Sequence, residues 1–317
     1  MYSQIASNKR RSIAFILLFF VLWLGIGALA GLLFGLYTNR PQAYGAQSAS
    51  VLGSVYGGMF VGACLAIIGI IYSLTAGAAL VLRVSGAEPA DPVQYQQIHD
   101  LVESLAIGDG IPKPAVYVIN DPSPNAFATG VSPNKAAITY TTGILQMMNR
   151  EELEGVTGHE MSHIKNHDIR LLLVVTTMIG MAALLASILW RSAFFSGMSR
   201  DRDNQIGAVL VMVGALLAVI GFVVGPLIRL ALSRRRESLA DASGVELTRN
   251  PQGLLSALKK LQQNDVPFKK MNHATAAMCI DDPLQHHESV IHRLYDTHPP
   301  IEERIAVLEK MVSGQIL

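Results

Sequence analysis

Four long apolar stretches set the strongest limit on what this chain can fold into. They cover residues 13–37, 51–82, 171–190 and 206–232. Each is long enough for the roughly 20 residues that an α-helix needs to cross the hydrocarbon core of a bilayer. Half of the 317 residues are hydrophobic, so the hydrophilic remainder is too small to bury the first two stretches in a soluble protein. For the second pair, helices buried inside a soluble domain are an open alternative to membrane spans, because Arg229 lies within the fourth stretch. The sequence therefore predicts an α-helical membrane protein with four transmembrane helices in two hairpins.

Basic residues predict the orientation of the first hairpin. Lys9, Arg10 and Arg11 precede the first stretch, whereas the loop after it offers only Arg40. Because basic residues are enriched in cytoplasmic loops, residues 1–12 should be cytoplasmic and the loop exported. The first stretch exceeds the 7–15 apolar residues of a signal peptide, so it is interpreted as an uncleaved anchor. The second hairpin carries arginines in its loop and after its second helix, and these give opposing signals.

Two hydrophilic segments, residues 84–170 and 233–317, are expected to form one domain that the second hairpin divides. The first begins with a predicted linker at residues 86–92, followed by one amphipathic helix and three strand-like runs. The helix is residues 93–107, and the strands are residues 114–119, 126–131 and 135–142. The second segment is predicted to be helical, with a proline near the start of each of two helices. Two cysteines are too few for a disulfide framework, which favours a reducing, cytosolic location for this domain.

The run GVTGHEMSHIKNHD holds the residues most typical of a metal site. Asn149 and Glu152 form a capping-box pattern, so a helix is predicted from about residue 150 to the third apolar stretch. On that helix His159 and His163 lie one turn apart, with Glu160 beside them. Two imidazoles in this H-E-x-x-H arrangement can bind one zinc ion, while the carboxylate reaches a water molecule on the metal. Two surface histidines are the simpler alternative, but the apolar edge of the helix disfavours it.

A catalytic zinc also needs a third protein ligand and an open position for water. His167 lies eight residues from His159, about 12 Å along a helix, which is too far for one ion to reach both. Glu237 and Asp241 lie one turn apart on a helix predicted to continue from the fourth stretch. Glu237 can therefore bind the metal while Asp241 hydrogen-bonds a liganding histidine and fixes its tautomer. A solvated acidic pair is the alternative. From the helical rise, we expect the metal on the order of 10 Å above the membrane boundary.

Five segments, in this order around the four stretches, resemble the HtpX-type bacterial membrane zinc metalloproteases, relatives of the prenyl-protein CAAX proteases. They are NDPSPNAFATG, HEMSH with Asn166 and Asp168, RRESLAD, AAMCIDDPL and THPPIEERI. The resemblance covers essentially the whole chain. It implies an α+β zincin-like (gluzincin) catalytic domain in the cytoplasm, one Zn²⁺ per chain, and a multi-pass location in a bacterial inner membrane with both termini cytoplasmic.

The resemblance also implies roles for individual residues. The implied zinc ligands are His159, His163 and Glu237. Glu160 would be the general base, His298 a donor to the oxyanion, and Arg304 a nearby support for the transition state. An edge strand would pair with the substrate backbone through Asn125, Ala126, Phe127, Ala128, Thr129 and Gly130. The residues alone leave two alternatives open. Residues 125–130 would be an ordinary strand, and His298 would merely precede a helix that starts at a proline.

The expected function is that of a membrane-embedded, zinc-dependent endopeptidase. It would hydrolyse misfolded or unassembled membrane proteins near the cytoplasmic face, in proteolytic quality control under stress. One alternative is a site-specific processing protease of a lipidated or signal-bearing substrate. Another is a non-enzymatic membrane protein with a structural zinc site, in which a glutamate beside the first histidine would serve no purpose. The expected partners are polypeptides and the lipid bilayer. A net charge of +1 argues against nucleic acid, and no oligomeric state is predicted.

Overall fold

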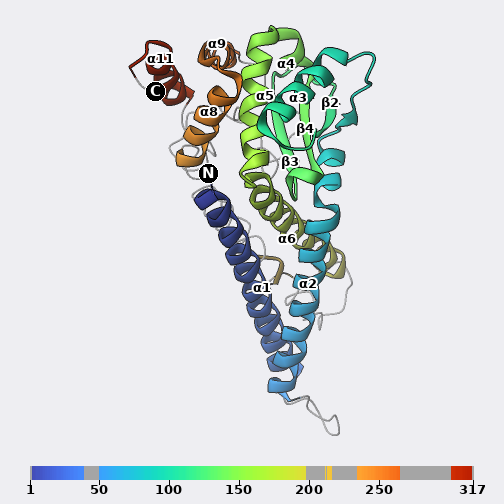
Figure 1. Cartoon of the computed structure of the whole chain (residues 1–317). Coiled ribbons are helices and arrows are strands. Elements are labelled where there is room, and N and C mark those ends of the chain that lie inside the picture. The colour runs from blue at the N-terminus through green and yellow to red at the C-terminus, as the bar shows by residue number, and fades with distance from the viewer. Residues whose placement is uncertain are drawn as a thin grey trace, which may run out of the picture. The chain divides into compact units, whose positions relative to one another are not determined.

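The computed structural model describes residues 2–38, 50–197, 211, 213–215, 234–264 and 301–315 (Figure 1). The chain divides into two compact units. The first comprises Met1–Arg10, Ala76–Thr176 and Pro226–Leu317, and the second comprises Arg11–Thr75 and Thr177–Gly225. Both of the hydrophilic segments therefore contribute to the first unit. Most of the fourth apolar stretch, residues 206–232, lies outside the described residues.

Within the described part of the first unit, four strands form one sheet in the order β1-β2-β4-β3. They are β1 (Glu88–Pro89), β2 (Ala115–Ile119), β3 (Ala126–Gly130) and β4 (Ala136–Thr141). β2 and β4 run parallel, while β1 and β3 are antiparallel to their neighbours. The three predicted strands are confirmed. The predicted linker at residues 86–92 is partly wrong, because Glu88 and Pro89 pair with β2, where an edge position tolerates the proline.

The helices that contact this sheet, or that pack on those helices, are α3 (Gln96–Asp109), α4 (Thr142–Met147), α5 (Arg150–Lys165), α8 (Arg234–Thr248), α9 (Pro251–Gln262) and α11 (Ile301–Val312). Helices α3, α4 and α5 contact the sheet, α8 and α9 pack on α5, and α11 packs on α9 (Figure 1). The apolar core includes residues of the sheet and of α5. The core cluster contains Ile138 and Tyr140 of β4 and Val156 and Ile164 of α5. Tyr140 Oη also lies 2.8 Å from Thr157 Oγ1, so a buried hydrogen bond ties β4 to the helix that carries the HEMSH motif.

The helix that carries the motif ends earlier than predicted. Asn149 and Glu152 form the predicted capping box at its start, but α5 ends at Lys165. His167 adopts a left-handed backbone with φ of 60°, and the next helix, α6 (Asp168–Gly197), begins immediately after it. The prediction of one continuous helix into the third apolar stretch is therefore wrong. Histidine is one of the non-glycine residues that enter this region more often than others, so the break needs no glycine.

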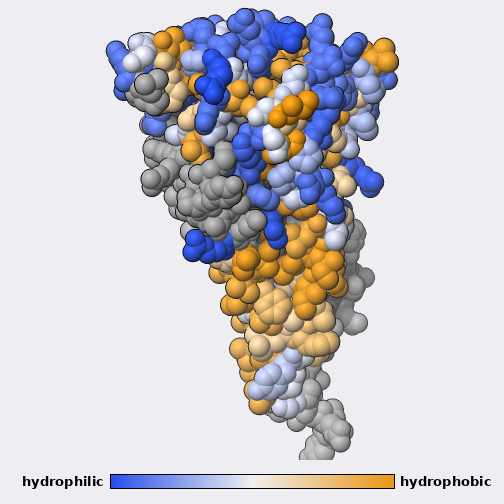
Figure 2. All heavy atoms as spheres, in the orientation of Figure 1, coloured by the Kyte–Doolittle hydropathy of each residue, from blue (hydrophilic) through white to orange (hydrophobic). Residues whose placement is uncertain are grey.

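The second unit contains long apolar helices. Three helices in the described chain are long and apolar enough to cross a membrane, at Ser12–Leu36, Val51–Val84 and Asp168–Ser192. They belong to α1 (Tyr2–Thr38), α2 (Val51–Val84) and α6. Figure 2 shows hydrophobic residues over most of the visible surface of α1 and α2. Phe60 is 71% exposed and Val21 is 62% exposed. Exposed apolar surface on this scale is typical of a membrane-facing protein, so three of the four predicted spans are confirmed as membrane-compatible helices.

Two contacts hold the helices of the second unit together. A Cβ atom on Gly27 of α1 would collide with the backbone of Gly58 of α2, so the two helices approach as closely as small residues allow. Ser73 of α2 and Thr177 of α6 share a buried hydrogen bond with Oγ–Oγ1 at 2.5 Å. Close glycine packing and hydroxyl pairs are both usual between helices in lipid, where apolar burial cannot drive association.

Candidate metal centre

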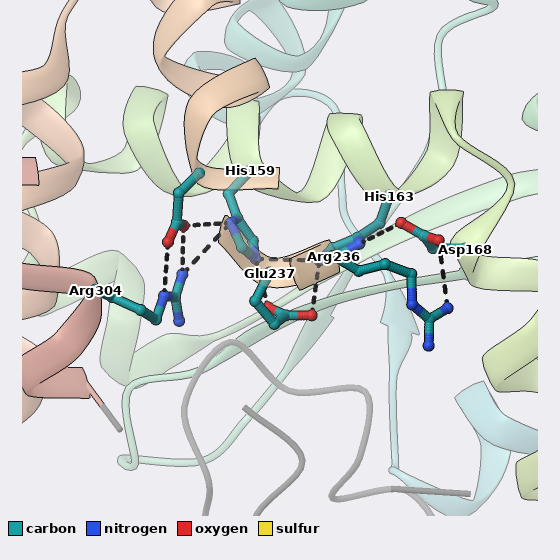
Figure 3. Close-up of polar contacts among 7 residues, drawn as sticks. His159, His163, Asp168, Arg236, Glu237 and Arg304 are labelled. Carbon is teal, nitrogen blue, oxygen red and sulfur yellow. Dashed lines mark hydrogen bonds and ion pairs between the residues drawn. The ribbon is translucent and has the colours of Figure 1, made fainter. Parts of the chain in front are cut away.

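Two buried histidines of α5 face each other across one helical turn (Figure 3). The Nε2 atoms of His159 and His163 are 3.1 Å apart, and their rings meet edge to face at 85°. His159 is fully buried, and His163 is 7% exposed. The four-residue spacing therefore places both imidazoles on one side of the helix, as the motif predicts.

Helix α8 brings a carboxylate to this pair. Glu237 Oε2 lies 3.5 Å from His159 Nε2, and Glu237 Oε1 lies 3.7 Å from His163 Nε2 (Figure 3). Glu237 is also buried. The residues predicted as metal ligands therefore lie together, although they are far apart in the sequence.

A glycine contact allows α8 to come this close to α5. Glu237, Asp241 and Gly244 follow each other at spacings of four and three residues, so they share one face of α8. A Cβ atom on Gly244 would lie 2.8 Å from the backbone N of His159 and 3.0 Å from the carbonyl carbon of Gly158. The absence of a side chain at Gly244 is thus what lets the two helix backbones touch beside the candidate site.

The three residues fit a metal ion. Their candidate ligand atoms all lie within 4.8 Å of one another. Zinc bonds of about 2.0–2.1 Å in tetrahedral geometry separate the ligand atoms by roughly 3.3–3.4 Å. Here the two Nε2 atoms are 3.1 Å apart, and the nearest Glu237 oxygen lies 3.5 Å from His159 Nε2 and 3.7 Å from His163 Nε2, with a different oxygen in each case. Both histidines direct Nδ1 at a carboxylate, so in the neutral form of each ring the Nε2 lone pair is available to a metal beside the Glu237 carboxylate. Three acceptors that converge in a buried site are stabilised by a cation, and three protein ligands leave a position for water.

Asp241 lies behind His159, as predicted for a tautomer-fixing residue. Its Oδ1 atom is 2.8 Å from His159 Nδ1. The guanidinium of Arg304, from α11, donates to both carboxylate oxygens, with Nη2–Oδ1 at 2.7 Å and Nε–Oδ2 at 3.0 Å. Figure 3 shows Arg304 reaching toward His159 from the side opposite His163. Arg304 therefore contacts the aspartate that hydrogen-bonds His159, and the sequence did not indicate this contact.

A second aspartate and arginine lie behind His163, and neither contact was predicted from the sequence. Asp168 Oδ2 is 3.1 Å from His163 Nδ1, and Arg236 Nη1 is 3.4 Å from Asp168 Oδ1 (Figure 3). On a continuous helix Asp168, five residues after His163, would point away from it. The left-handed residue His167 brings it back. Arg236 directly precedes Glu237, but in the sequence it belongs to an arginine cluster that signals membrane orientation.

The surrounding charges decide how the buried groups ionise. Burial lowers the pKa of His159, but hydrogen bonds with Asp241 and Glu237 outweigh this effect and raise it to about 9. Burial opposes the charged form of His163 too, yet the charge of Glu237 and its hydrogen-bonded aspartate raise its pKa above the usual value. Burial alone would raise the pKa of Asp241, but Arg304 and His159 hold it well below its usual range. A metal ion must therefore compete with protons for the two histidines.

The other predicted site residues are placed as follows. Glu160 follows His159 on α5 and is buried, at 2% exposure. Asn125 directly precedes β3, which spans Ala126–Gly130, and all of these residues are buried. His298 lies outside the described residues. Of the predicted site, the described structure therefore brings together the three candidate ligands, Asp241 and Arg304.

β3 lies at one end of the described sheet, and its hydrogen bonding can be read from the ladder. Thr141 N donates to Asn125 O at 2.9 Å, so these residues form a hydrogen-bonded pair. Such pairs alternate along an antiparallel ladder, so Phe127 and Thr129 direct their backbone N–H and C=O groups at β4. The residues whose backbone groups point the other way, where no strand is described, are Ala126, Ala128 and Gly130.

Comparisons with known proteins identify the family. The protein-family model described as "Peptidase family M48" matches residues 92–312, which include all three candidate ligands. A "Protease HtpX homolog" from Streptococcus gordonii is 39% identical over 318 residues, covering 98% of this chain and 100% of the relative. A protein of the same name from Caldanaerobacter subterraneus is 46% identical over 235 residues, covering 73% of this chain and 77% of the relative. The crystal structure of S. mikatae Ste24p has a TM-score of 0.48 at 20% identity, over 78% of this chain and 57% of that one. The expected resemblance is confirmed, and the chain belongs to peptidase family M48 as a metalloprotease with membrane-compatible helices.

Proposed function

We propose that this chain is a zinc endopeptidase that cleaves misfolded or unassembled membrane proteins near the cytoplasmic face of a bacterial inner membrane. The observation that carries the proposal is the convergence of His159, His163 and Glu237, whose candidate ligand atoms lie within 4.8 Å of one another in a buried site. Nitrogen and carboxylate ligands in a tetrahedral spacing favour zinc over magnesium or calcium, which prefer all-oxygen sites. Family membership supports peptide-bond hydrolysis as the reaction.

The arrangement of the chain in the membrane is part of the proposal. Four helices in two hairpins would span the bilayer, with residues 84–170 and 233–317 forming the catalytic domain on the cytoplasmic side. The basic residues before the first span support this orientation. The candidate span Asp168–Ser192 begins at the residue whose carboxylate contacts His163. The metal would therefore lie closer to the start of this span than a continuous helix would allow, which supports substrates held at the membrane surface.

The roles of the residues follow from their positions. When bound, zinc would polarise the scissile carbonyl and lower the pKa of a water molecule. Glu160, next to the first ligand, would take the proton of the attacking water and deliver it to the leaving amine. An extended substrate would pair with the outward backbone groups of β3, which gives affinity without demanding one sequence. His298 would donate to the oxyanion. Arg304 would support the transition state indirectly, through Asp241 and His159.

The test uses the full-length protein in liposomes with two matched substrates. One is a soluble unfolded reporter, and the other is the same reporter tethered by one transmembrane helix. We expect the tethered form to be cleaved faster, at several sites, with activity lost to a chelator and restored by Zn²⁺. Equal cleavage of both forms would contradict membrane-proximal action. Cleavage at one site only would favour a processing protease, and activity unaffected by the chelator would refute the zinc mechanism.

A further inference from the structure

Each candidate ligand histidine has an aspartate behind it, and each aspartate is paired with an arginine. For His163 the pair is Asp168 and Arg236. His163 Nδ1 lies 3.1 Å from Asp168 Oδ2, and Arg236 Nη1 lies 3.4 Å from the other oxygen, Asp168 Oδ1. Asp168 is 2% exposed and Arg236 is 8% exposed. Because these groups are buried, bulk water cannot replace either contact at low cost. This pair joins the start of α6 to the helix that supplies Glu237.

We propose that Asp168 is a positioning residue for His163, and that it must be a carboxylate because Arg236 occupies its other oxygen. The proposal rests on the metal site of the proposed function. An ionised aspartate can only accept hydrogen bonds. Its Oδ2 therefore obliges His163 to carry its proton on Nδ1, and Nε2 is left with a free lone pair directed toward Glu237 and the metal position.

Arg236 makes the need for a carboxylate at position 168 stricter than the hydrogen bond to His163 alone would make it. A guanidinium has five donors and no acceptor. If Asp168 were replaced by asparagine, Arg236 would attract the amide oxygen to the Oδ1 position. The amide NH₂ would then face His163 Nδ1, which would have to accept. The histidine proton would move to Nε2 and block the atom needed for the metal. Asparagine, although nearly identical in shape, should thus select the wrong tautomer.

A double-mutant cycle tests this reasoning by metal binding. The assay is zinc affinity of the full-length protein in detergent, measured by competition with a chromophoric chelator at one fixed pH. We expect Asp168→Asn to weaken zinc binding by roughly 10–100-fold, the usual effect of losing such a partner. Arg236→Met should leave binding no weaker than in the wild type, because Asp168 still accepts from Nδ1. In the double variant the guanidinium at position 236 no longer draws the amide oxygen away from His163, so most of the lost affinity should return.

A purely structural role predicts a different pattern. Loss of a buried ion pair would weaken both single variants, and the double variant would be no better than Asp168→Asn. That result would overturn the proposal. The absorption spectrum of the cobalt-substituted protein adds a second readout, since it should change in Asp168→Asn and return toward the wild type in the double variant. Glu103→Gln is the control of matched charge, because Glu103 pairs with Lys113 on the surface, and it should change neither readout.

The remaining outcomes are separable. If Asp168→Asn does not fold, as judged by the melting temperature of the metal-free protein, Arg236→Met alone decides. Binding as tight as in the wild type supports the proposal, and a loss of about tenfold or more contradicts it. If the wild type itself binds no zinc, the proposed function fails. If the wild type binds zinc and cleaves its substrate but the cycle shows no recovery, only the role of Asp168 fails.

Discussion

Replacing Gly244 with alanine should loosen the metal site without unfolding the domain. The added Cβ would lie 2.8 Å from His159 N. The two helix backbones must move apart by about 0.7 Å for this Cβ to lie at an ordinary separation of about 3.5 Å from His159 N. Metal ligands tolerate displacements of only about 0.2 Å. Overpacking costs about 1–3 kcal/mol, and better helix propensity offsets about 1 kcal/mol. The fold should therefore survive, while zinc affinity should fall at least tenfold, or about 1.4 kcal/mol.

The assay is chelator competition for zinc affinity, with the melting temperature of the metal-free protein measured in parallel. Gly108→Ala is the matched control, because it is also a helical glycine of the first unit. Its Cβ would meet only Leu247 Cδ1, at an ordinary contact distance of 3.4 Å. It should keep full zinc affinity. If Gly244→Ala bound zinc as tightly as the wild type, the argument that this glycine contact positions Glu237 would be refuted.

Three further changes test the electrostatics and the edge strand. Protonation of His159 stabilises the metal-free fold fully below its usual pKa of 6.5, and this contribution is lost as the pH rises through about 9. The melting temperature of the metal-free protein should fall over that interval while zinc affinity rises, and the opposite trends would contradict the assignment. Arg304→Met removes both guanidinium contacts from the buried Asp241 and leaves it its contact with His159. Urea unfolding should therefore show a loss of up to about 3–5 kcal/mol, and an unchanged free energy of unfolding would be inconsistent with the pair. Ala128→Pro removes an outward N–H, whereas Thr129→Pro removes an N–H that bonds β4. Ala128→Pro should therefore lower kcat/KM with a smaller loss of stability than Thr129→Pro causes. Equal effects of the two variants on kcat/KM and on stability would argue against pairing of substrate at this edge.

Local patterns carried the parts of the site that could be predicted from the sequence. The capping box of Asn149 and Glu152 and the one-turn spacing of His159 and His163 depend on neighbours within a few residues. The one-turn spacing of Glu237 likewise indicated a ligand beside a partner aspartate. The contact between α5 and α8 could not be predicted from such local patterns. It depends on Gly244 meeting the α5 backbone across the domain, and a glycine within a helix does not identify what it touches.

The support behind His163 could not be predicted, for two physical reasons. A left-handed histidine at position 167 ends α5, and a single residue of this kind has no pattern that a helical period reveals. Arg236, in turn, lies in a basic cluster beside an apolar stretch, where the sequence is equally well explained by membrane orientation. Arg304 was expected near the transition state. The structure places its guanidinium on Asp241, in a contact between helices that no local spacing encodes.

The most direct test of the account is the Glu160→Gln variant, assayed for bound zinc and for cleavage of an unfolded reporter on the same preparation. Glu160 is not one of the three candidate ligands, so zinc content should equal that of the wild type. Glutamine cannot take a proton from water, so cleavage should fall by roughly 10²–10⁴-fold, the usual contribution of a general base. A Glu160→Gln protein that holds its full zinc and cleaves at the wild-type rate would contradict the proposed mechanism.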